Sequence, residues 1–285
     1  MSEFEQIRYE VDGRVARVIL DRPNYRNAQS RLLREEMDEA FDRAVADREV
    51  RVIVLMGAGH SFSAGHDLGT PEEQADKAER PYEEGLRGRF ERSASMNVEN
   101  TLRWRNLPKP TIAVVQGYCI FGGWMIASAM DLIFASDDAM FLGTNFQYFS
   151  PPWDIHPRKV KEIFFESRFI DGPEAMELGL VNRVYPAERL EAEAMAYARR
   201  VAENDPFQLR MMKQAVNHAQ DSQGFNEHIN GAHLMYLMSS QGERDPGFAL
   251  DKPEGRRRPM VQRAVENYEL YQAEQQGTEG TKEDS

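Results

Sequence analysis

The stretch GYCIFGGWMIASAMDL, residues 117–132, decides both the fold and the kind of site that this chain can carry. A strand-like run ends at the adjacent glycines Gly122 and Gly123, and a short apolar segment follows them. Strand, Gly-Gly and helix in this order present bare backbone N–H groups to a ligand, because the first amides of a helix have no acceptor inside it. The side chains nearest to these amides, such as Met125 and Ser128, offer no acid or base.

Apolar runs on either side of this stretch predict a mostly parallel sheet. The chain starts with alternating β-branched residues around Asp12 and Gly13, which predict a hairpin. Three continuous apolar runs, typical of strands buried on both faces, follow at residues 50–59, 111–118 and 131–136. Helical segments separate the strands, and the first is the amphipathic segment 30–47, capped by Ser30. The fold class is therefore α/β, with right-handed crossovers between strands.

The later part of the chain is predicted to be helical. The segment 70–106 is polar and becomes helical toward its end, and the sheet pattern fades after Gly172. Four helices are expected over residues 187–204, 207–220, 225–240 and 258–272. Their methionine-rich faces indicate core or subunit contact rather than a cofactor site. We expect an α/β core over residues 1–200, a helical part over 201–275 and a disordered tail over 276–285.

Composition and charge narrow the classes of function. A net charge of −12 disfavours nucleic-acid binding, although a local cluster such as residues 256–258 could hold one phosphate. No apolar run reaches the roughly 18 residues that a membrane-spanning helix needs, and the first residues do not resemble a signal peptide. The single cysteine, Cys119, cannot form an internal disulfide, and we expect it to be a buried apolar residue. These features predict a cytoplasmic protein with no nucleic-acid or membrane partner.

A second loop with small residues, GAGHSFSAGHDLG at residues 57–69, follows a predicted buried strand. Its residues Ser63, Ala64 and Gly65 let a ligand approach the backbone closely. Two loops at the carboxyl ends of parallel strands can each aim one N–H group at a single oxygen, which is an oxyanion hole. Removal of one such donor costs on the order of 3 kcal/mol of transition-state stabilisation.

The order of these loops resembles that of the crotonase family, also called the enoyl-CoA hydratase/isomerases. The resemblance covers roughly residues 5–240 and is carried by DRPNYRNAQS (21–30), SFSAGHDL (61–68), KPTIAVVQGYCIFGGWMIASAMDLIFASDDAMF (109–141), RKVKEIFF (158–165) and GPEAMELGLVNRVYP (172–186). It implies a crotonase-like spiral of ββα units and a helical C-terminal part for trimerisation and active-site cover. It also implies an acyl-CoA thioester substrate, homotrimers or dimers of trimers, no metal, and no cofactor beyond the coenzyme A of the substrate.

The resemblance assigns roles to particular positions. The oxyanion donors would be the backbone N–H groups of His66 and Gly122. The coenzyme A arm would lie along Arg26 and Ala28, and its adenine would lie near Ala64, Asp67 and Leu68.

Two departures from the family pattern affect the chemistry. Hydratases of the family carry two glutamates, and the corresponding positions are Met125 and Asn145. A methionine cannot move a proton and an amide is no general base near neutral pH, so the usual hydration of an enoyl thioester is in question. The SAGHD sequence that contains His66 resembles the methylmalonyl-CoA decarboxylase branch, in which a histidine near the leaving carboxylate would fit. Alternatively, only the backbone of His66 matters.

The segment QYFSPPWDIHPRK, residues 147–159, replaces a Gly-rich stretch of the family. It would place Tyr148, Trp153, Asp154 and His156 near the acyl group. Asp154 could replace the missing acid or base, or it could only cap the next helix, and His156 is expected to be structural or exposed.

Three functions stay open at this point. The nearest is an enoyl-CoA hydratase with a displaced acid and base. The second is decarboxylation, isomerisation or thioester hydrolysis through the same enolate, and the third is acyl-CoA binding without catalysis. Because Phe121, Trp124 and Trp153 suggest an aromatic pocket, we expect a bulky or ring-containing acyl group.

Overall fold

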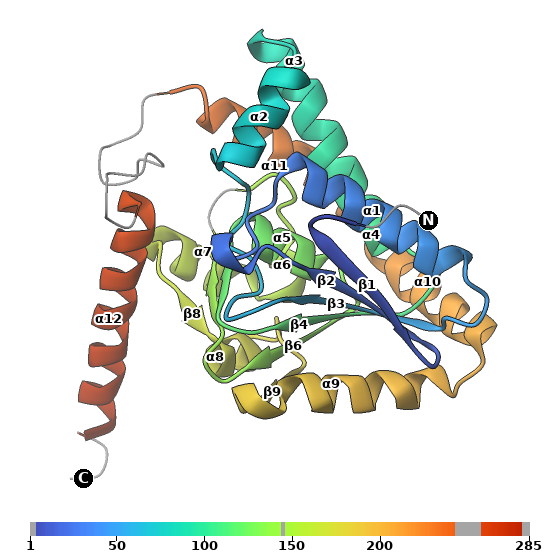
Figure 1. Ribbon diagram of the computed structural model, residues 1–285. Coiled ribbons are helices and arrows are strands. Elements are labelled where there is room, and N and C mark those ends of the chain that lie inside the picture. Colours follow the sequence, from blue (N-terminus) through green and yellow to red (C-terminus); the bar gives the residue numbers. More distant parts are fainter. Residues whose placement is uncertain (1–3, 144–145, 243–257, 281–285) are drawn as a thin grey trace.

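A six-stranded, mostly parallel sheet forms the centre of the molecule (Figure 1). The computed structural model describes residues 4–143, 146–242 and 258–280 of the chain. In spatial order the strands are β1 (Ile7–Asp12), β2 (Val15–Leu20), β3 (Val52–Gly57), β4 (Thr111–Val115), β6 (Leu132–Ser136) and β9 (Arg183–Tyr185). Only β1 and β2 pair in antiparallel fashion, as the predicted hairpin, and the other neighbours are parallel. The predicted α/β class is confirmed.

A second sheet of three short strands, β5 (Tyr118–Ile120), β7 (Met140–Leu142) and β8 (Ile170–Asp171), was not expected from the apolar runs. The run 111–118 is not one strand, because the chain leaves the first sheet after Val115 and enters the second at Tyr118. Gly117 permits this bend: its φ is +52°, and a Cβ there would lie 2.0 Å from the carbonyl oxygen of His60. The bend carries the Gly-Gly stretch away from the main sheet and toward the loop that follows β3.

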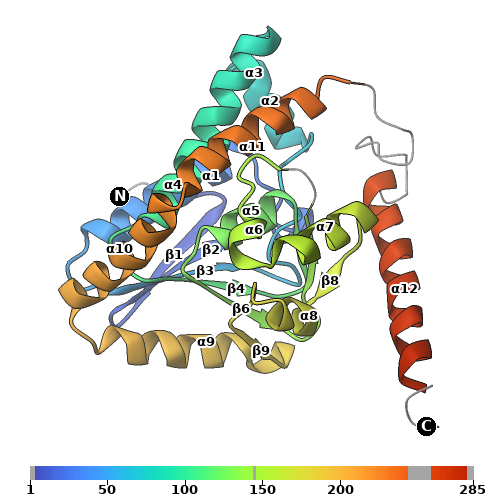
Figure 2. The ribbon, with the colours of Figure 1, turned by 180° about the vertical axis from the view of Figure 1, so that it is seen from behind.

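Helices cover both faces of the main sheet (Figures 1 and 2). Helix α1 (Arg31–Ala46) begins as predicted, because the hydroxyl of Ser30 accepts a 3.0 Å hydrogen bond from the N–H of Leu33. Its residues Leu33, Met37 and Phe41 are buried in the larger core. On the opposite face, α9 (Ala187–Ala202) forms a second core with strands β2, β3 and β4.

The polar segment after the SAGHD loop is more broken than expected. It contains α2 (Pro71–Glu79), α3 (Gly85–Ser93), a π-helical turn over Ala94–Glu99 and α4 (Asn100–Arg105). Helices α2 and α3 rise above the sheet on the side of α1 (Figure 1). The π-helical turn is of interest because such turns occur frequently at functional sites.

The remaining helices are α5 (Gly122–Ser128), α6 (Pro151–Asp154), α7 (Pro157–Glu166), α8 (Gly172–Glu177), α10 (Pro206–Ser222), α11 (Phe225–Ser239) and α12 (Pro259–Gly280), and a single 3₁₀ turn covers Pro23–Tyr25. Helix α10 has no buried residue, and Met212, Val216 and Met238 are among the exposed apolar side chains of α10 and α11. Subunit contact therefore stays a prediction for this surface.

Helix α12 packs on the smaller sheet, where Ala264 is buried with Phe169 and Leu142. The helix extends to Gly280, beyond residue 276, where a disordered tail was expected to start. No helix within the described ranges is long and apolar enough to cross a membrane. Cys119 is fully buried, as predicted, and burial raises the pKa of its thiol.

A buried ion pair joins the two segments on which the site is built. The Arg22 guanidinium, after β2, donates a 2.7 Å hydrogen bond to the Asp67 carboxylate, after β3, and both side chains are almost completely buried. The same carboxylate accepts hydrogen bonds from the N–H groups of Gly69 and Thr70. Burial alone raises the pKa of Asp67, but hydrogen bonds from Thr70 and Arg22 outweigh it and hold the pKa below its usual value.

We predict that Asp67→Asn destabilises the fold by about 3 kcal/mol, because it removes the buried counter-charge of Arg22 and leaves only the half-exposed Glu72 at 3.5 Å. The lowered pKa of Asp67 means that the pair stabilises the protein above about pH 4, and that this contribution is lost as the pH falls through the folded pKa. Urea unfolding of both proteins between pH 7 and pH 3 measures the difference, which should shrink on acidification.

Glu203→Gln is the matched control, because it removes one carboxylate from the exposed ion pair with Arg14. We expect it to change stability by less than about 1 kcal/mol. An equal loss in the two variants would contradict a structural role for the Arg22–Asp67 pair.

Candidate active site

The two glycine-containing loops predicted to act together lie against each other. The N–H of Ser63 donates to the carbonyl oxygen of Tyr118 at 3.0 Å, and the N–H of Ile120 donates to the carbonyl oxygen of Ser63 at 2.9 Å. Ser63 and Cys119 thus form a short parallel bridge between the loop after β3 and strand β5. The bridge fixes the register of the two loops, and hence which of the residues that follow Ser63 and Cys119 lie opposite each other.

This contact leaves no room for side chains at the glycines. A Cβ on Gly65 would lie 2.7 Å from the carbonyl oxygen of Ile120 and 3.1 Å from the amide nitrogen of Gly122. A Cβ on Gly123 would lie 2.5 Å from the carbonyl oxygen of Ser63. Gly65 and Gly123 are therefore required where the two loops meet, and the loops approach backbone to backbone.

Two N–H groups at this contact have no acceptor within the described part of the chain. The N–H of Gln29 donates to the carbonyl oxygen of Gly65, and the carbonyl oxygen of Gln29 accepts a hydrogen bond from the N–H of Asp67. In this parallel bridge the N–H of His66, the residue between them, points away from Gln29. The N–H of Gly122 is at the start of α5, where no helical acceptor exists. Both N–H groups are thus unsatisfied, and they belong to adjoining backbone segments, because a Cβ built on Gly65, the residue before His66, would lie 3.1 Å from the Gly122 nitrogen.

Phe121, the residue before Gly122, has a strained backbone with φ +48° and ψ −106°. Such a conformation costs on the order of 1–3 kcal/mol in a non-glycine residue. It is held by a 2.8 Å hydrogen bond from its N–H to the carbonyl oxygen of Leu142 in β7. Because ψ of Phe121 sets the plane of the next peptide, the strain determines the direction of the Gly122 N–H.

The imidazole of His66 lies beside Gly122. Its Cε1 and Nδ1 atoms are each 3.1 Å from where a Gly122 Cβ would stand, and its Nε2 lies 3.4 Å from Oε1 of Gln147. Burial, and second the positive charge of Arg34, lower its pKa to about 4, although the Gln147 contact acts in the other direction. The ring is therefore neutral near pH 7 and offers one donor and one acceptor nitrogen.

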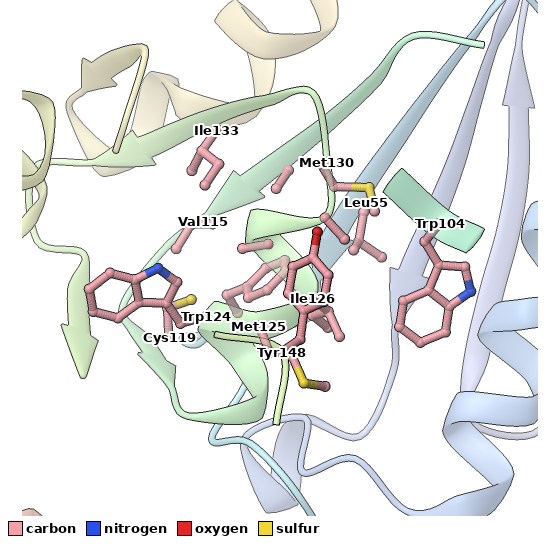
Figure 3. Close-up of a cluster of buried hydrophobic side chains, with 14 of the residues drawn as sticks. Leu55, Trp104, Val115, Cys119, Trp124, Met125, Ile126, Met130, Ile133 and Tyr148 are labelled. Atoms are coloured by element: carbon pink, nitrogen blue, oxygen red, sulfur yellow. The ribbon is translucent and has the colours of Figure 1, made fainter. Parts of the chain in front are cut away.

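Met125 does not line an open site. It is fully buried in the core beside Trp124, Ile126 and Tyr148, and Figure 3 shows its side chain among these residues. Asn145, the other position at which the resemblance implies a family glutamate, lies outside the described residues. The Met125 side chain contributes to core packing.

A cavity of about 380 Å³ opens beside His66. Its wall contains two carboxylates, Asp67 and Glu73, and five cationic side chains: Arg31, Arg34, Lys77, Arg89 and Arg92. This composition differs from the aromatic lining that we expected. Trp124 is fully buried in the core, and neither it nor Phe121 is among the lining residues. The expectation of a bulky acyl group therefore has no support from Phe121 or Trp124, although Tyr82 and apolar side chains such as Met96 stand beside the charged groups of this wall.

Asp154 and Trp153 are placed elsewhere. Trp153 stacks on Phe225 and donates a 3.0 Å hydrogen bond to Nδ1 of His228. Asp154 is exposed at the end of α6 and does not line the cavity. Desolvation of its carboxyl by the surrounding protein atoms raises its pKa to about 7, against the opposing positive charge of Arg105. The structure thus does not bring Asp154 together with His66.

The helix cap that Asp154 could have supplied comes from His156. Its Nδ1 accepts a 3.3 Å hydrogen bond from the N–H of Arg158 at the start of α7. His156 is exposed, as expected for a structural residue.

The residues expected along coenzyme A are close together. The N–H of Ala64 donates to the carbonyl oxygen of Arg26 at 2.8 Å, and the carbonyl oxygen of Ala28 accepts a hydrogen bond from Arg22. Leu68 is half exposed, whereas the carboxylate of Asp67 is occupied by Arg22 and Thr70. The Asp67 side chain is therefore structural, and a ligand at this edge would meet backbone atoms and Leu68.

Sequence reasoning missed the residues of the polar wall, above all Arg34 and Asn97. The helical periodicity of the sequence contained one indication that Arg34 is buried. It lies at helical spacing between Ser30 and Met37, on the face of α1 that also carries Phe41, so a cation was placed within an apolar stripe. Asn97 had no such signal, because it lies on the π-helical turn.

Comparison with known proteins agrees with this architecture. The enoyl-CoA hydratase/isomerase family model matches residues 10–249. EchA13 of Mycobacterium tuberculosis, named as a candidate enoyl-CoA hydratase, is 38% identical over 258 residues, which cover 83% of this chain and 81% of that protein.

Two solved structures show the same fold. An enoyl-CoA hydratase/isomerase from Xanthobacter autotrophicus Py2 is 31% identical with a TM-score of 0.79, over 92% of this chain and 98% of that one. A probable enoyl-CoA hydratase from Mycobacterium thermoresistibile is 39% identical with a TM-score of 0.76, over 83% and 97% of the two chains. The chain therefore belongs to the enoyl-CoA hydratase/isomerase family and has the crotonase fold of an enzyme of that family.

We predict that the His66 ring stays neutral well below the usual pKa of a histidine, because burial and Arg34 both disfavour its charged form. Its ring resonance, assigned by comparison with His66→Gln in an NMR titration, should hold the neutral chemical shift down to about pH 5. Titration of this resonance near pH 6.5 would contradict the burial and the proximity to Arg34.

Proposed function

We propose that the protein is an acyl-CoA thioester enzyme whose backbone oxyanion hole stabilises a thioester enolate, and that its nearest activity is that of an enoyl-CoA hydratase. The observation that carries this proposal is the pair of unsatisfied N–H groups, from His66 and Gly122, held next to each other by contacts between glycine backbones. Donors fixed in this way stabilise charge that develops on a thioester oxygen without reorganisation during the reaction.

His66 is the side chain best placed to handle a proton. It lines the cavity beside Gly122, and its neutral ring can donate through one nitrogen and accept through the other. The described carboxylates of the cavity, Asp67 and Glu73, are both held in ion pairs, with Arg22 and Lys77. The proposal therefore assigns proton movement to His66 and gives Asp154 no part in it.

A second candidate is enolate chemistry that needs less help from acids and bases, namely decarboxylation or isomerisation. It is favoured by the burial of Met125, which leaves the first family position without a titratable group. In a decarboxylation the hole stabilises the enolate that forms when carbon dioxide leaves, so no strong base is required.

We also propose that the protein acts as a homotrimer or a dimer of trimers. The exposed apolar side chains of α10 and α11, including Met212 and Val216, support a subunit contact there. We place the coenzyme A arm near Arg26, Ala28, Ala64 and Leu68, because these residues share one edge beside the hole.

The first test is turnover of crotonyl-CoA, followed by loss of absorbance of the enoyl thioester. Gly122→Pro removes the N–H donor and should lower kcat by about 100-fold or more. Gly122→Ala is the matched control, since it adds a Cβ at the same crowded position but keeps the N–H. Equal losses in the two variants would indicate steric damage and not a missing donor.

A second comparison separates the imidazole of His66 from its backbone. His66→Ala keeps the N–H and removes the ring, and we expect kcat to fall by about 100-fold if the ring moves the proton. Asp154→Asn should change kcat by less than about twofold, because this carboxyl does not line the cavity. Activity of His66→Ala equal to wild type would restrict His66 to its backbone role.

A further inference from the structure

The cavity wall beside His66 contains a buried arginine without a counter-ion. The side chain of Arg34, on α1, is 5% exposed. Its Nη1 donates a 2.6 Å hydrogen bond to Oδ1 of Asn97, whereas its Nε and Nη2 are buried and have no acceptor among the described residues. A buried guanidinium with two free donors is rare in a folded protein, because the loss of hydration is not compensated.

The acidic side chains around Arg34 are already engaged. Glu73 forms a 3.0 Å ion pair with Lys77 and accepts a hydrogen bond from the N–H of Arg31. Asp76 pairs with the side chain of Arg31 at 3.0 Å. Within the described part of the chain, no carboxylate forms an ion pair with Arg34. Burial lowers the pKa of Arg34 to about 10, so it remains positively charged at neutral pH.

The unpartnered Nε and Nη2 atoms of Arg34 form one edge of its planar guanidinium group. The bond from Nη1 to Asn97, on the π-helical turn, holds the guanidinium and leaves its Nε–Nη2 edge without a partner among the described residues. That edge presents two parallel N–H groups, the arrangement that matches the two oxygens of a carboxylate.

The same cavity joins Arg34 to the proposed oxyanion hole. Arg34 and His66 both line it, and the positive charge of Arg34 contributes to the low pKa of His66. Elsewhere in the cavity wall, the guanidinium groups of Arg31 and Arg92 lie 3.8 Å and 4.3 Å from the ring centre of Tyr82. The wall is thus positively charged in a chain whose net charge is −12.

We propose that the acyl group of the substrate carries a carboxylate of its own, which Arg34 binds through Nε and Nη2. The substrate class is therefore the acyl-CoA thioesters of dicarboxylic acids. This inference rests on the proposed function, since it places the thioester oxygen at His66 and Gly122 and the second carboxylate deeper in the same cavity.

Binding of glutaryl-CoA and pentanoyl-CoA, measured by calorimetry, tests the inference. Each acyl group has five carbons and no reactive double bond, and they differ only in a terminal carboxylate or methyl group. We expect glutaryl-CoA to bind at least about tenfold more tightly to the wild-type protein. In Arg34→Met this preference should fall below about threefold, with little change for pentanoyl-CoA. The matched control is Arg87→Met, because Arg87 is exposed and does not line the cavity.

The outcomes separate the two proposals. If neither thioester binds, the acyl-CoA function itself fails. Equal binding of both to the wild-type protein overturns the carboxylate inference and leaves the acyl-CoA function standing. If Arg34→Met weakens both thioesters and free coenzyme A by the same factor, Arg34 binds a coenzyme A phosphate and the inference is wrong. Should Arg34→Met not fold, the wild-type comparison still decides, and Arg34→Lys shows whether charge without the planar guanidinium group is enough.

Discussion

The structure depends on one backbone contact, between the loop after β3 and the turn that starts α5. Gly65 and Gly123 each face a carbonyl oxygen at a distance that excludes a Cβ, and the Ser63–Cys119 bridge sets their register. The buried Arg22–Asp67 pair anchors one loop, and the hydrogen bond from Phe121 to Leu142 anchors the other. Since the donors of the proposed hole belong to these backbones, the geometry of the site is a direct result of this packing.

Much of this architecture could be predicted from the sequence, because it is encoded by local rules. Continuous apolar runs identified strands β3, β4 and β6, the Ser30 cap identified the start of α1, and the order of the loops identified the contact between them. The second sheet was missed because its strands have two or three residues, too few for an apolar run to reveal. The bend at Gly117 that separates β4 from β5 depends on a contact with His60, which is distant in the sequence.

The site was predicted less completely than the fold. Backbone positions such as His66 and Gly122 followed from the loops, but the charged and polar side chains of the cavity wall come mostly from α1, α2, α3 and the π-helical turn. Aromatic residues near the Gly-Gly stretch suggested an apolar pocket, yet Trp124 packs inward against Phe141. Which face of a short helix is buried cannot be read from seven residues, since either face of α5 is apolar.

The proposed hole is built from backbone amides, and this has a consequence for how such an enzyme can diverge. No exchange of side chain at position 66 deletes the donor there, and only proline would do so. Any constraint on the proposed hole therefore acts through the neighbouring glycines, whereas the side chain at position 66 can change without loss of the donor. The packing of Met125 in the core and the positively charged wall around Arg34 are separate features beside these backbone donors. Descendants of such a scaffold can gain or lose a reaction without losing the thioester.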